Sequence, residues 1–229
     1  MLIGNVAGSV RADESSFVSS LPIGFRQAGI YRGGFKRALD VVLVLLAAPL
    51  ALLIVGLLCP LIALDGRSPF YSQERIGREG RRFRMWKLRS MVDDAEARLE
   101  AHLAAHPDAR REWDARQKLR NDPRITRIGR LIRKTSLDEL PQLWNVLIGD
   151  MSIVGPRPMM PSQREIYPGT AYYALRPGIT GFWQTSARNE SSFAERADYD
   201  SRYFGKLSLW TDLGVILRTV RVVACGTGC

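Results

Sequence analysis

The dominant feature in the pattern of apolar and polar positions is an uncharged run from Val41 to Leu64, bounded by Asp40 and Asp65. A straight helix of this length would reach roughly 36 Å, slightly more than the hydrocarbon core of a bilayer at about 30 Å. Core helices of soluble proteins are rarely so uniformly apolar, because they usually keep a polar face. The pattern therefore predicts a membrane helix.

Pro49 lies in the first half of this run, where its ring removes one backbone hydrogen bond and clashes with the preceding turn. Basic residues flank the run on both sides, and basic flanks prefer the cytoplasmic side of a membrane. If both flanks obey this preference, the segment enters and leaves by the same face. We therefore predict a re-entrant membrane helix over residues 35–66 with a helix break at Pro49. A kinked single span is the alternative.

Shorter elements follow this run. Residues 70–73 and 83–88 have the composition of short strands around two glycines, which predicts a β-hairpin that carries several Arg side chains. The stretch 93–118 is rich in Ala, Glu, Arg and Leu, and Pro107 is expected to divide it into two helices. Residues 155–181 contain many Pro and Gly residues and predict an ordered loop.

Helical spacing recurs in the second half of the chain. Ile128, Leu131 and Ile132 lie among basic residues and predict a basic amphipathic helix. Its apolar stripe would suit either a membrane surface or packing on the body, and the pattern leaves both open. A further helix is predicted over residues 136–149, ended by a glycine, and an amphipathic C-terminal helix over residues 209–220.

Together these elements predict an α+β fold that is mainly helical. It is expected to be a monotopic membrane protein with an N-terminal re-entrant membrane helix, amphipathic surface helices and a small β-hairpin. Residues 1–34 are polar and lack clear periodicity, so we expect a flexible N-terminal extension. Residues 35–66 form the membrane helix, and residues 67–229 form the body with its interfacial helices.

Charge and composition narrow the choice of partners. The chain of 229 residues is 46% hydrophobic and carries a formal net charge of +10, so it should fold and bind anionic groups. It shows no aromatic–basic motif or recognition helix, so we predict no nucleic-acid partner. His102 and His106 make an incomplete zinc site, and Cys59, Cys225 and Cys229 are expected to be reduced and structural.

The first candidate site is the sequence TSLDELPQ at residues 135–142. Ser136 with Glu139 three residues later has the pattern of a capping box, in which the acidic pair would complement the helix dipole. The same pair, Asp138 and Glu139, follows Arg133 in a strongly basic protein, and divalent cations prefer carboxylate oxygens. Asp can also act as a nucleophile towards phosphorus. The residues alone leave both interpretations open.

Two loop motifs are further candidates. Arg157 stands between two prolines in GPRP (155–158), on a stiffened backbone that limits the entropy lost when its guanidinium binds a phosphate. The sequence RPGITG (176–181) would form tight turns, where glycine lets a backbone approach a ligand closely. A solvent-facing Arg and ordinary turn chemistry would explain both motifs equally well.

With these motifs in order, the chain resembles the bacterial sugar transferases, the small monotopic polyprenyl-phosphate phosphoglycosyl transferases. It is most similar to their exopolysaccharide undecaprenyl-phosphate galactosephosphotransferase type. The resemblance covers about residues 35–225 and rests on five motifs: KLRSM (87–91), SLDELPQ (136–142), GDMS (149–152), GPRP (155–158) and RPGITG (176–181).

The resemblance implies a catalytic body on the cytoplasmic face of the bacterial inner membrane. It implies that hexose 1-phosphate, with galactose or glucose as the sugar, moves from a UDP-sugar to undecaprenyl phosphate with release of UMP. Asp138 falls on the family nucleophile, which would form an aspartyl-phosphosugar intermediate, and Glu139 on its partner carboxylate; both would bind the cofactor Mg²⁺. Substrate binding is implied for Lys87, Arg89, Arg133, Arg157, Arg176 and Asp200.

One departure and two open questions accompany this resemblance. The family often carries Ser before the proline of the membrane helix, whereas here Ala48 precedes Pro49, so a hydroxyl that could support the bend is absent. The alternative function is a non-catalytic membrane-surface scaffold of a polysaccharide assembly complex, which the basic helices and the apolar anchor would suit. A homodimer is a hypothesis that the sequence leaves open.

Overall fold

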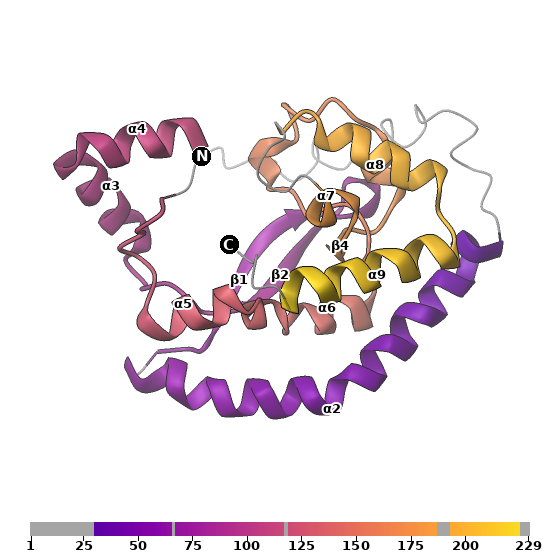
Figure 1. The fold of residues 1–229 in the computed structure, drawn as a ribbon, viewed down its shortest axis with the longest axis horizontal. Coiled ribbons are helices and arrows are strands. Elements are labelled where there is room, and N and C mark those ends of the chain that lie inside the picture. Colours follow the sequence, from indigo (N-terminus) through magenta and orange to yellow (C-terminus); the bar gives the residue numbers. More distant parts are fainter. Residues whose placement is uncertain (1–29, 66, 117–118, 187–192, 225–229) are drawn as a thin grey trace, which may run out of the picture.

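The computed structural model describes residues 30–65, 67–116, 119–186 and 193–224. Most of the predicted extension over residues 1–34 lies outside these ranges, as do Cys225 and Cys229. Within them the protein is mainly helical, with two small two-stranded sheets and one long N-terminal helix. Figure 1 shows that this helix curves along one side of the body. The architecture is compatible with a monotopic membrane protein.

The long helix is α2 (Lys36–Ile62), which a π-helical turn (Tyr31–Phe35) precedes and a 3₁₀ turn (Ala63–Asp65) follows. Pro49 and Pro60 both lie inside it, and the helix continues through them. The expected break at Pro49 is therefore a bend within one continuous helix, which is visible as the curve of α2 in Figure 1. Each proline removes one backbone bond, but the neighbouring turns keep theirs.

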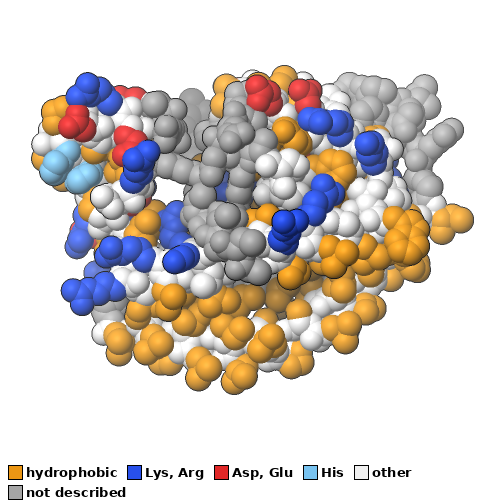
Figure 2. All heavy atoms as spheres, in the orientation of Figure 1, with side chains coloured by type: hydrophobic (Ala, Val, Ile, Leu, Met, Phe, Trp, Pro, Cys, Tyr) orange, Lys and Arg blue, Asp and Glu red, His pale blue; other side chains and the backbone are white. Residues whose placement is uncertain are grey.

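The outer face of α2 is apolar and exposed. Figure 2 shows the resulting apolar band along the lower edge of the molecule. Within the described ranges, one helix is long and apolar enough to cross a membrane, Tyr31–Ile62. Contact with water would be unfavourable for so large an apolar surface, so this face suits lipid. The exposed leucines of α2 and the following turn include Leu45, Leu46, Leu50, Leu52, Leu53, Leu57, Leu61 and Leu64.

The predicted hairpin and the helix pair after it are confirmed. β1 (Phe70–Ile76) pairs with β2 (Arg82–Leu88) in an antiparallel register. Two helices follow, α3 (Ala95–Ala105) and α4 (Pro107–Arg116), and they meet at the proline as expected. In Figure 1 these two helices project to one side of the body.

α5 (Arg127–Lys134) is the predicted basic amphipathic helix, and its apolar stripe faces two environments. Ile132 is fully buried and packs with Ile62 and Leu88. Leu131, the preceding residue, is 58% exposed. Packing on the body is therefore confirmed for the Ile132 part of the stripe, while contact of Leu131 with a membrane surface stays a prediction.

The helices α6 to α9 complete the described part of the body. α6 (Gln142–Ile148) ends at Gly149, whose φ of 94° lies in the left-handed region that glycine favours, as the sequence predicted. The other helices are α7 (Phe182–Thr185), α8 (Arg196–Gly205) and α9 (Leu209–Ala224). α9 confirms the predicted C-terminal amphipathic helix.

The parallel strand pair was not predicted from the sequence, and neither were α7 and α8. β3 (Ser152–Val154) pairs with β4 (Gly178–Thr180), and β4 lies inside the stretch that was predicted to be loop. That stretch also contains 3₁₀ turns at Pro161–Gln163 and Ala171–Ala174. Strands of three residues are too short to show an alternating pattern, so their pairing is visible only in three dimensions.

Buried polar contacts attach the first turns of α2 to the body. Asp40 is only 3% exposed and accepts hydrogen bonds from the Ser152 hydroxyl (2.8 and 3.0 Å) and from the Ile153 backbone N–H (3.0 Å). Lys36 forms an ion pair with Asp212 of α9 at 2.7 Å. These bonds fix α2 against both β3 and α9.

Arg37 makes a second attachment beside the first. Its guanidinium donates to the backbone carbonyls of Val146 and Leu147, the latter at 2.7 Å. These carbonyls belong to the last turn of α6, where carbonyl groups lack partners within the helix and a cation is favourable. Arg37 of α2 therefore caps the C-terminal end of α6.

We predict that Asp40→Ala destabilises the protein by about 3 kcal/mol, because the buried Ser152 hydroxyl and Ile153 N–H would lose their acceptor. Thermal unfolding in detergent measures this loss. Glu100→Ala is the control, since the Glu100 side chain is 66% exposed in its pair with Arg110 and should matter by less than about 0.5 kcal/mol. Equal effects of the two substitutions would contradict a structural role for Asp40.

Candidate active site

The two adjacent carboxylates lie in a 3₁₀ turn (Leu137–Glu139) between α5 and α6, opposite Lys87 of β2. Lys87 Nζ is 2.9 Å from Glu139 Oε1 and 3.7 Å from Asp138 Oδ2. The Asp138 side chain is 12% exposed, whereas the side chains of Lys87 and Glu139 are 23% and 22% exposed. One ammonium group therefore bridges both carboxylates, and Asp138 is the deeper of the two.

The groups around Asp138 shift its pKa in opposite directions. Burial raises the pKa of Asp138 above the usual value for Asp, and the Glu139 carboxylate raises it further. The Lys87 ammonium and the Arg133 guanidinium lower it by favouring the ionised form. Arg133 therefore belongs to the electrostatic environment of the pair, and its predicted role in substrate binding stays a prediction. An ionised carboxylate in such a poorly hydrated site is suited to nucleophilic attack.

The predicted capping box is wrong. Ser136 has a φ of 57° in the left-handed region, and its side chain makes no capping hydrogen bond. An N-cap residue needs an extended backbone to direct its hydroxyl at the first turn. Instead, the Glu139 N–H donates to the Ser136 backbone carbonyl at 3.2 Å. The acidic pair therefore lies in a tight turn of its own, before Pro141 leads into α6.

Asn145 of α6 binds the backbone of β2, the strand that carries Lys87. The sequence analysis did not identify this residue. Asn145 is fully buried; its Oδ1 accepts from the Trp86 N–H at 3.0 Å, and its Nδ2 donates to the Arg84 carbonyl at 2.7 Å. These two bonds set β2 against the turn that holds the carboxylates. An amide among the apolar residues of α6 was the available signal, since a buried amide needs specific partners.

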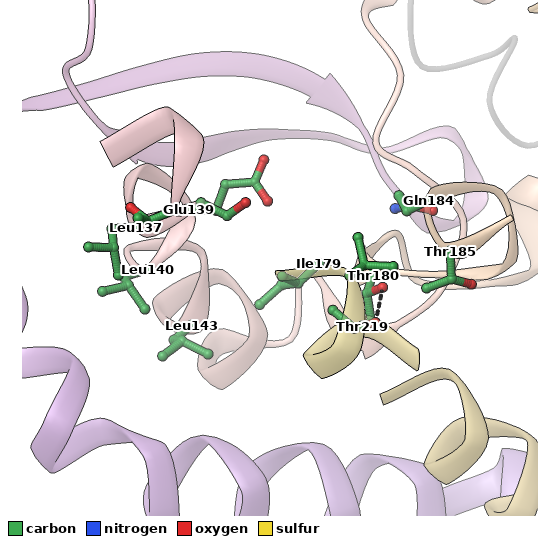
Figure 3. Close-up of a pocket in the computed structure, with 12 residues that line it drawn as sticks. Leu137, Glu139, Leu140, Leu143, Ile179, Thr180, Gln184, Thr185 and Thr219 are labelled. Atoms are coloured by element: carbon green, nitrogen blue, oxygen red, sulfur yellow. Dashed lines mark hydrogen bonds between the residues drawn. The ribbon is translucent and has the colours of Figure 1, made fainter. Parts of the chain in front are cut away.

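A cavity of about 290 Å³ opens beside Glu139. Figure 3 shows Leu137, Glu139, Leu140 and Leu143 on one side and Gln184 and Thr185 on the other, with Ile179, Thr180 and Thr219 between them. Thr135, Ser136 and Val222 complete its lining. The cavity lies between the 3₁₀ turn, α6, β4, α7 and α9, so a ligand in it would contact Glu139 directly.

Arg157 lies in a cluster of guanidinium groups around Trp183. The Cζ atoms of Arg157 and Arg196 lie 5.6 and 5.3 Å from the centre of the Trp183 indole ring. Arg196 also donates to the Arg157 backbone carbonyl at 2.7 Å. Burial, together with the charges of Arg157 and Arg196, lowers the pKa of Arg75 to about 10. An anion would relieve this repulsion, and guanidinium groups bind phosphate well.

Two members of this arginine cluster, Arg75 and Arg196, were missed by the sequence analysis. Arg75 was grouped with the general basic surface of the hairpin, and Arg196 lies in a charged stretch without a motif. The prolines on either side of Arg157 distinguished it from other arginines, whereas nothing local distinguished the other two. Their contribution depends on strands and helices that are distant in sequence.

Asp200 of α8 lies beside the arginine cluster. It is 4% exposed and accepts a hydrogen bond of 2.6 Å from the Tyr167 hydroxyl. Burial raises the pKa of Asp200 to about 6, although the Tyr167 hydrogen bond and the Arg196 charge oppose this shift. Asp200 thus supplies a negative charge next to Arg196, and its predicted role in substrate binding stays a prediction.

The contacts of Arg89 and Arg176 lie at the ends of helices. Arg89 donates to the backbone carbonyls of Ile62 at 3.0 Å and Ser68 at 2.8 Å, and so holds the end of α2. Arg176 Nε donates to the Gly149 carbonyl at 2.9 Å, just beyond the end of α6. Through these bonds both arginines stabilise the fold. Their predicted substrate contacts stay predictions.

The carboxylate pair has the chemistry to bind a divalent cation. In the described parts of the chain, no three or more His, Cys, Asp and Glu side chains converge on a point. The rings of His102 and His106 stack at 4.3 Å, and both residues are solvent-accessible. Mg²⁺ often takes only one or two protein carboxylates and completes its shell with water and substrate phosphates. Asp138 and Glu139 fit that requirement.

Comparison with known proteins gives a consistent result. A family described as bacterial sugar transferase matches residues 31–226. The chain is 48% identical to a UDP-galactose-lipid carrier transferase of Erwinia amylovora and 44% identical to an undecaprenyl-phosphate galactose phosphotransferase of Salmonella typhimurium, over 82% of its own length in each case. It covers 40% of each of these two relatives. It is also 44% identical to the exopolysaccharide production protein ExoY of Rhizobium meliloti, over 86% of this chain and 88% of that protein.

Proposed function

Because this chain belongs to the bacterial sugar transferase family, we propose that it transfers a hexose 1-phosphate from a UDP-sugar to undecaprenyl phosphate and releases UMP. The observation that carries this proposal is the bridge from Lys87 to Asp138 and Glu139 beside a cavity. Two of the relatives are named for galactose, so galactose is the first sugar we propose and glucose the second. The product would be the lipid-linked sugar that starts exopolysaccharide synthesis.

In the first step, an Asp138 carboxylate oxygen attacks the phosphorus that carries the sugar. The bond from this phosphorus to the bridging oxygen breaks, its electron pair stays with the departing UMP, and an aspartyl-phosphosugar remains. Lys87 supports the attack because its charge favours the ionised form of Asp138. Mg²⁺ held by Asp138 and Glu139 would offset the negative charge that develops on the leaving phosphate.

In the second step, an oxygen of undecaprenyl phosphate attacks the same phosphorus. The bond to Asp138 breaks, and the carboxylate returns to its ionised form beside Lys87. The arginine cluster of Arg75, Arg157 and Arg196 is suited to hold the phosphate groups in place, since planar guanidinium groups bind them bidentately. A purely structural scaffold would have no use for a buried carboxylate beside an acidic neighbour, which costs stability.

We propose that α2 is re-entrant and that the body lies on the cytoplasmic face of the inner membrane; the contacts of α2 support the re-entrant part of this proposal. Its first turns bind the body through Arg37 and Asp40. Its last turn binds the same body, because the Ile62 carbonyl accepts from Arg89 and the Ile62 side chain packs with Ile132. Attachment of both ends to one body favours entry and exit by the same membrane face. Figure 2 places Lys and Arg side chains just above the apolar band, where anionic headgroups would lie.

We predict that Asp138→Asn lowers turnover by at least about a thousandfold, because an amide is a poor nucleophile and an ordinary functional-group loss has effects of this order. The assay measures UMP release from a panel of UDP-sugars in detergent with Mg²⁺ and undecaprenyl phosphate. Asp108→Asn is the control, since that side chain is 91% exposed. Full activity of Asp138→Asn would refute the nucleophile assignment, and no release by the unaltered chain from any sugar would refute the proposed function.

The rate of UMP release should fall on the acid side as Asp138 becomes protonated. We expect the midpoint of this fall to lie above the range of an ordinary Asp, since burial raises the pKa of Asp138. Lys87→Met removes the charge that lowers this pKa, so it should move the midpoint to higher pH. Rate–pH profiles of both proteins measure the shift. A midpoint that stays in place, or moves to lower pH, would disprove the electrostatic role of Lys87.

The re-entrant topology predicts that both flanks of α2 are accessible from the cytoplasm. Single cysteines at Gly33 and Ser68, two exposed positions, are introduced with Cys59 replaced by Ala and Cys225 and Cys229 replaced by Ser. A membrane-impermeant maleimide should label both in inside-out vesicles and neither in right-side-out vesicles. Labelling of the two positions from opposite sides would establish a single span instead.

A further inference from the structure

The cavity beside Glu139 has few polar groups left to offer a ligand. Several of its hydroxyl groups already bond within the protein: Thr135 Oγ1 donates to the Leu131 carbonyl at 2.8 Å, and Thr185 Oγ1 donates to the Gly181 carbonyl at 2.9 Å. The Thr180 and Thr219 hydroxyls bond to each other at 2.7 Å. The walls are otherwise made mainly by Leu, Ile and Val side chains. The cavity therefore suits a largely apolar or planar group.

Gln184 is the exception among the cavity residues. It is 6% exposed, and neither its Nε2 nor its Oε1 has a hydrogen-bond partner among the described residues. A buried amide without partners is costly, and such groups are few in folded proteins. A side chain at position 181 would meet Gln184, since a Cβ there would lie 2.9 Å from its Oε1. Gly181 therefore leaves room for an amide whose partners are not supplied by these residues.

The chemistry of this amide restricts the ligand. Gln184 presents a donor and an acceptor side by side, so it pairs best with a planar group that carries an acceptor next to a donor. A hexose would need partners for several hydroxyl groups, and beside the Gln184 amide this lining offers the Ser136 hydroxyl and the Glu139 carboxylate, which already pairs with Lys87. An isoprenoid chain would leave the amide unpaired against hydrocarbon, which is unfavourable. The imide edge of uracil, with its N3–H beside a carbonyl, satisfies both atoms while its ring packs on apolar walls.

We propose that this cavity binds the uracil base of the donor nucleotide, with Gln184 Nε2 donating to a uracil carbonyl and Oε1 accepting from uracil N3–H. The proposal rests on the proposed function, which supplies the uridine nucleotide. The neighbouring residue Trp183 supports it, because Arg157 and Arg196 lie over its ring. Gln184, which would bind the base, is therefore adjacent in α7 to the residue that the proposed phosphate-binding arginines contact. Gln184 is then a specificity residue, distinct from the reacting carboxylates.

The test compares UMP with N3-methyl-UMP, in which a methyl group blocks the edge that Gln184 reads. Calorimetric titration of the full chain in detergent should show at least tenfold weaker binding of the methylated nucleotide, the effect of about 1.4 kcal/mol. Gln184→Leu should weaken UMP to the level of N3-methyl-UMP and abolish the difference between the two. Gln163→Leu is the matched control, because that amide accepts from the Met160 N–H instead and should keep the difference.

Three results would overturn the proposal. The unaltered chain could bind both nucleotides equally, a result that needs no variant to fold. Gln184→Leu could retain the preference for UMP. It could also raise the KM for undecaprenyl phosphate and leave UMP binding unchanged, which would assign the cavity to the lipid acceptor. Failure of the proposed function is a separate result: no UMP release from any UDP-sugar, whatever the titrations with UMP show.

Discussion

The polar attachment of α2 to the body is the constraint on which the rest of the structure depends. Apolar packing is not directional, so leucines alone would let this helix slide or rotate on its neighbours. Asp40 and Arg37 remove that freedom, because a buried carboxylate and a guanidinium tolerate only the arrangement that satisfies their hydrogen bonds. The helix therefore meets the body in one register, with its leucine-rich face outward.

The same constraint reaches the candidate active site through a short series of contacts. Arg37 binds the last turn of α6, and Asn145 in that helix holds β2 by two backbone hydrogen bonds. β2 carries Lys87, and the turn before α6 carries Asp138 and Glu139. α6 therefore connects the attachment of α2 to the candidate catalytic residues. In the proposed reaction, which joins a nucleotide sugar to a lipid, such coupling would keep the carboxylates near the membrane surface.

Local pattern was sufficient for the elements whose formation depends on neighbouring residues. The apolar helix, the hairpin, the two helices that meet at Pro107 and the C-terminal amphipathic helix all followed from it. The pattern failed where distant contacts prevail over local preference. Ser136 has the sequence context of a helix cap but adopts a left-handed conformation instead. β3 and β4 are too short to be recognised separately, and only their pairing makes them strands.

The sequence by itself determined the apolar character of α2 and the adjacency of Asp138 and Glu139, because composition and covalent connection fix both. Only the tertiary structure placed Lys87 between the two carboxylates, and only it brought Arg75 and Arg196 to Arg157. It also buried the Gln184 amide without partners among the described residues. The physical reason is that charge, burial and hydrogen-bond satisfaction depend on what surrounds a side chain. Those surroundings come from segments that are far apart along the chain.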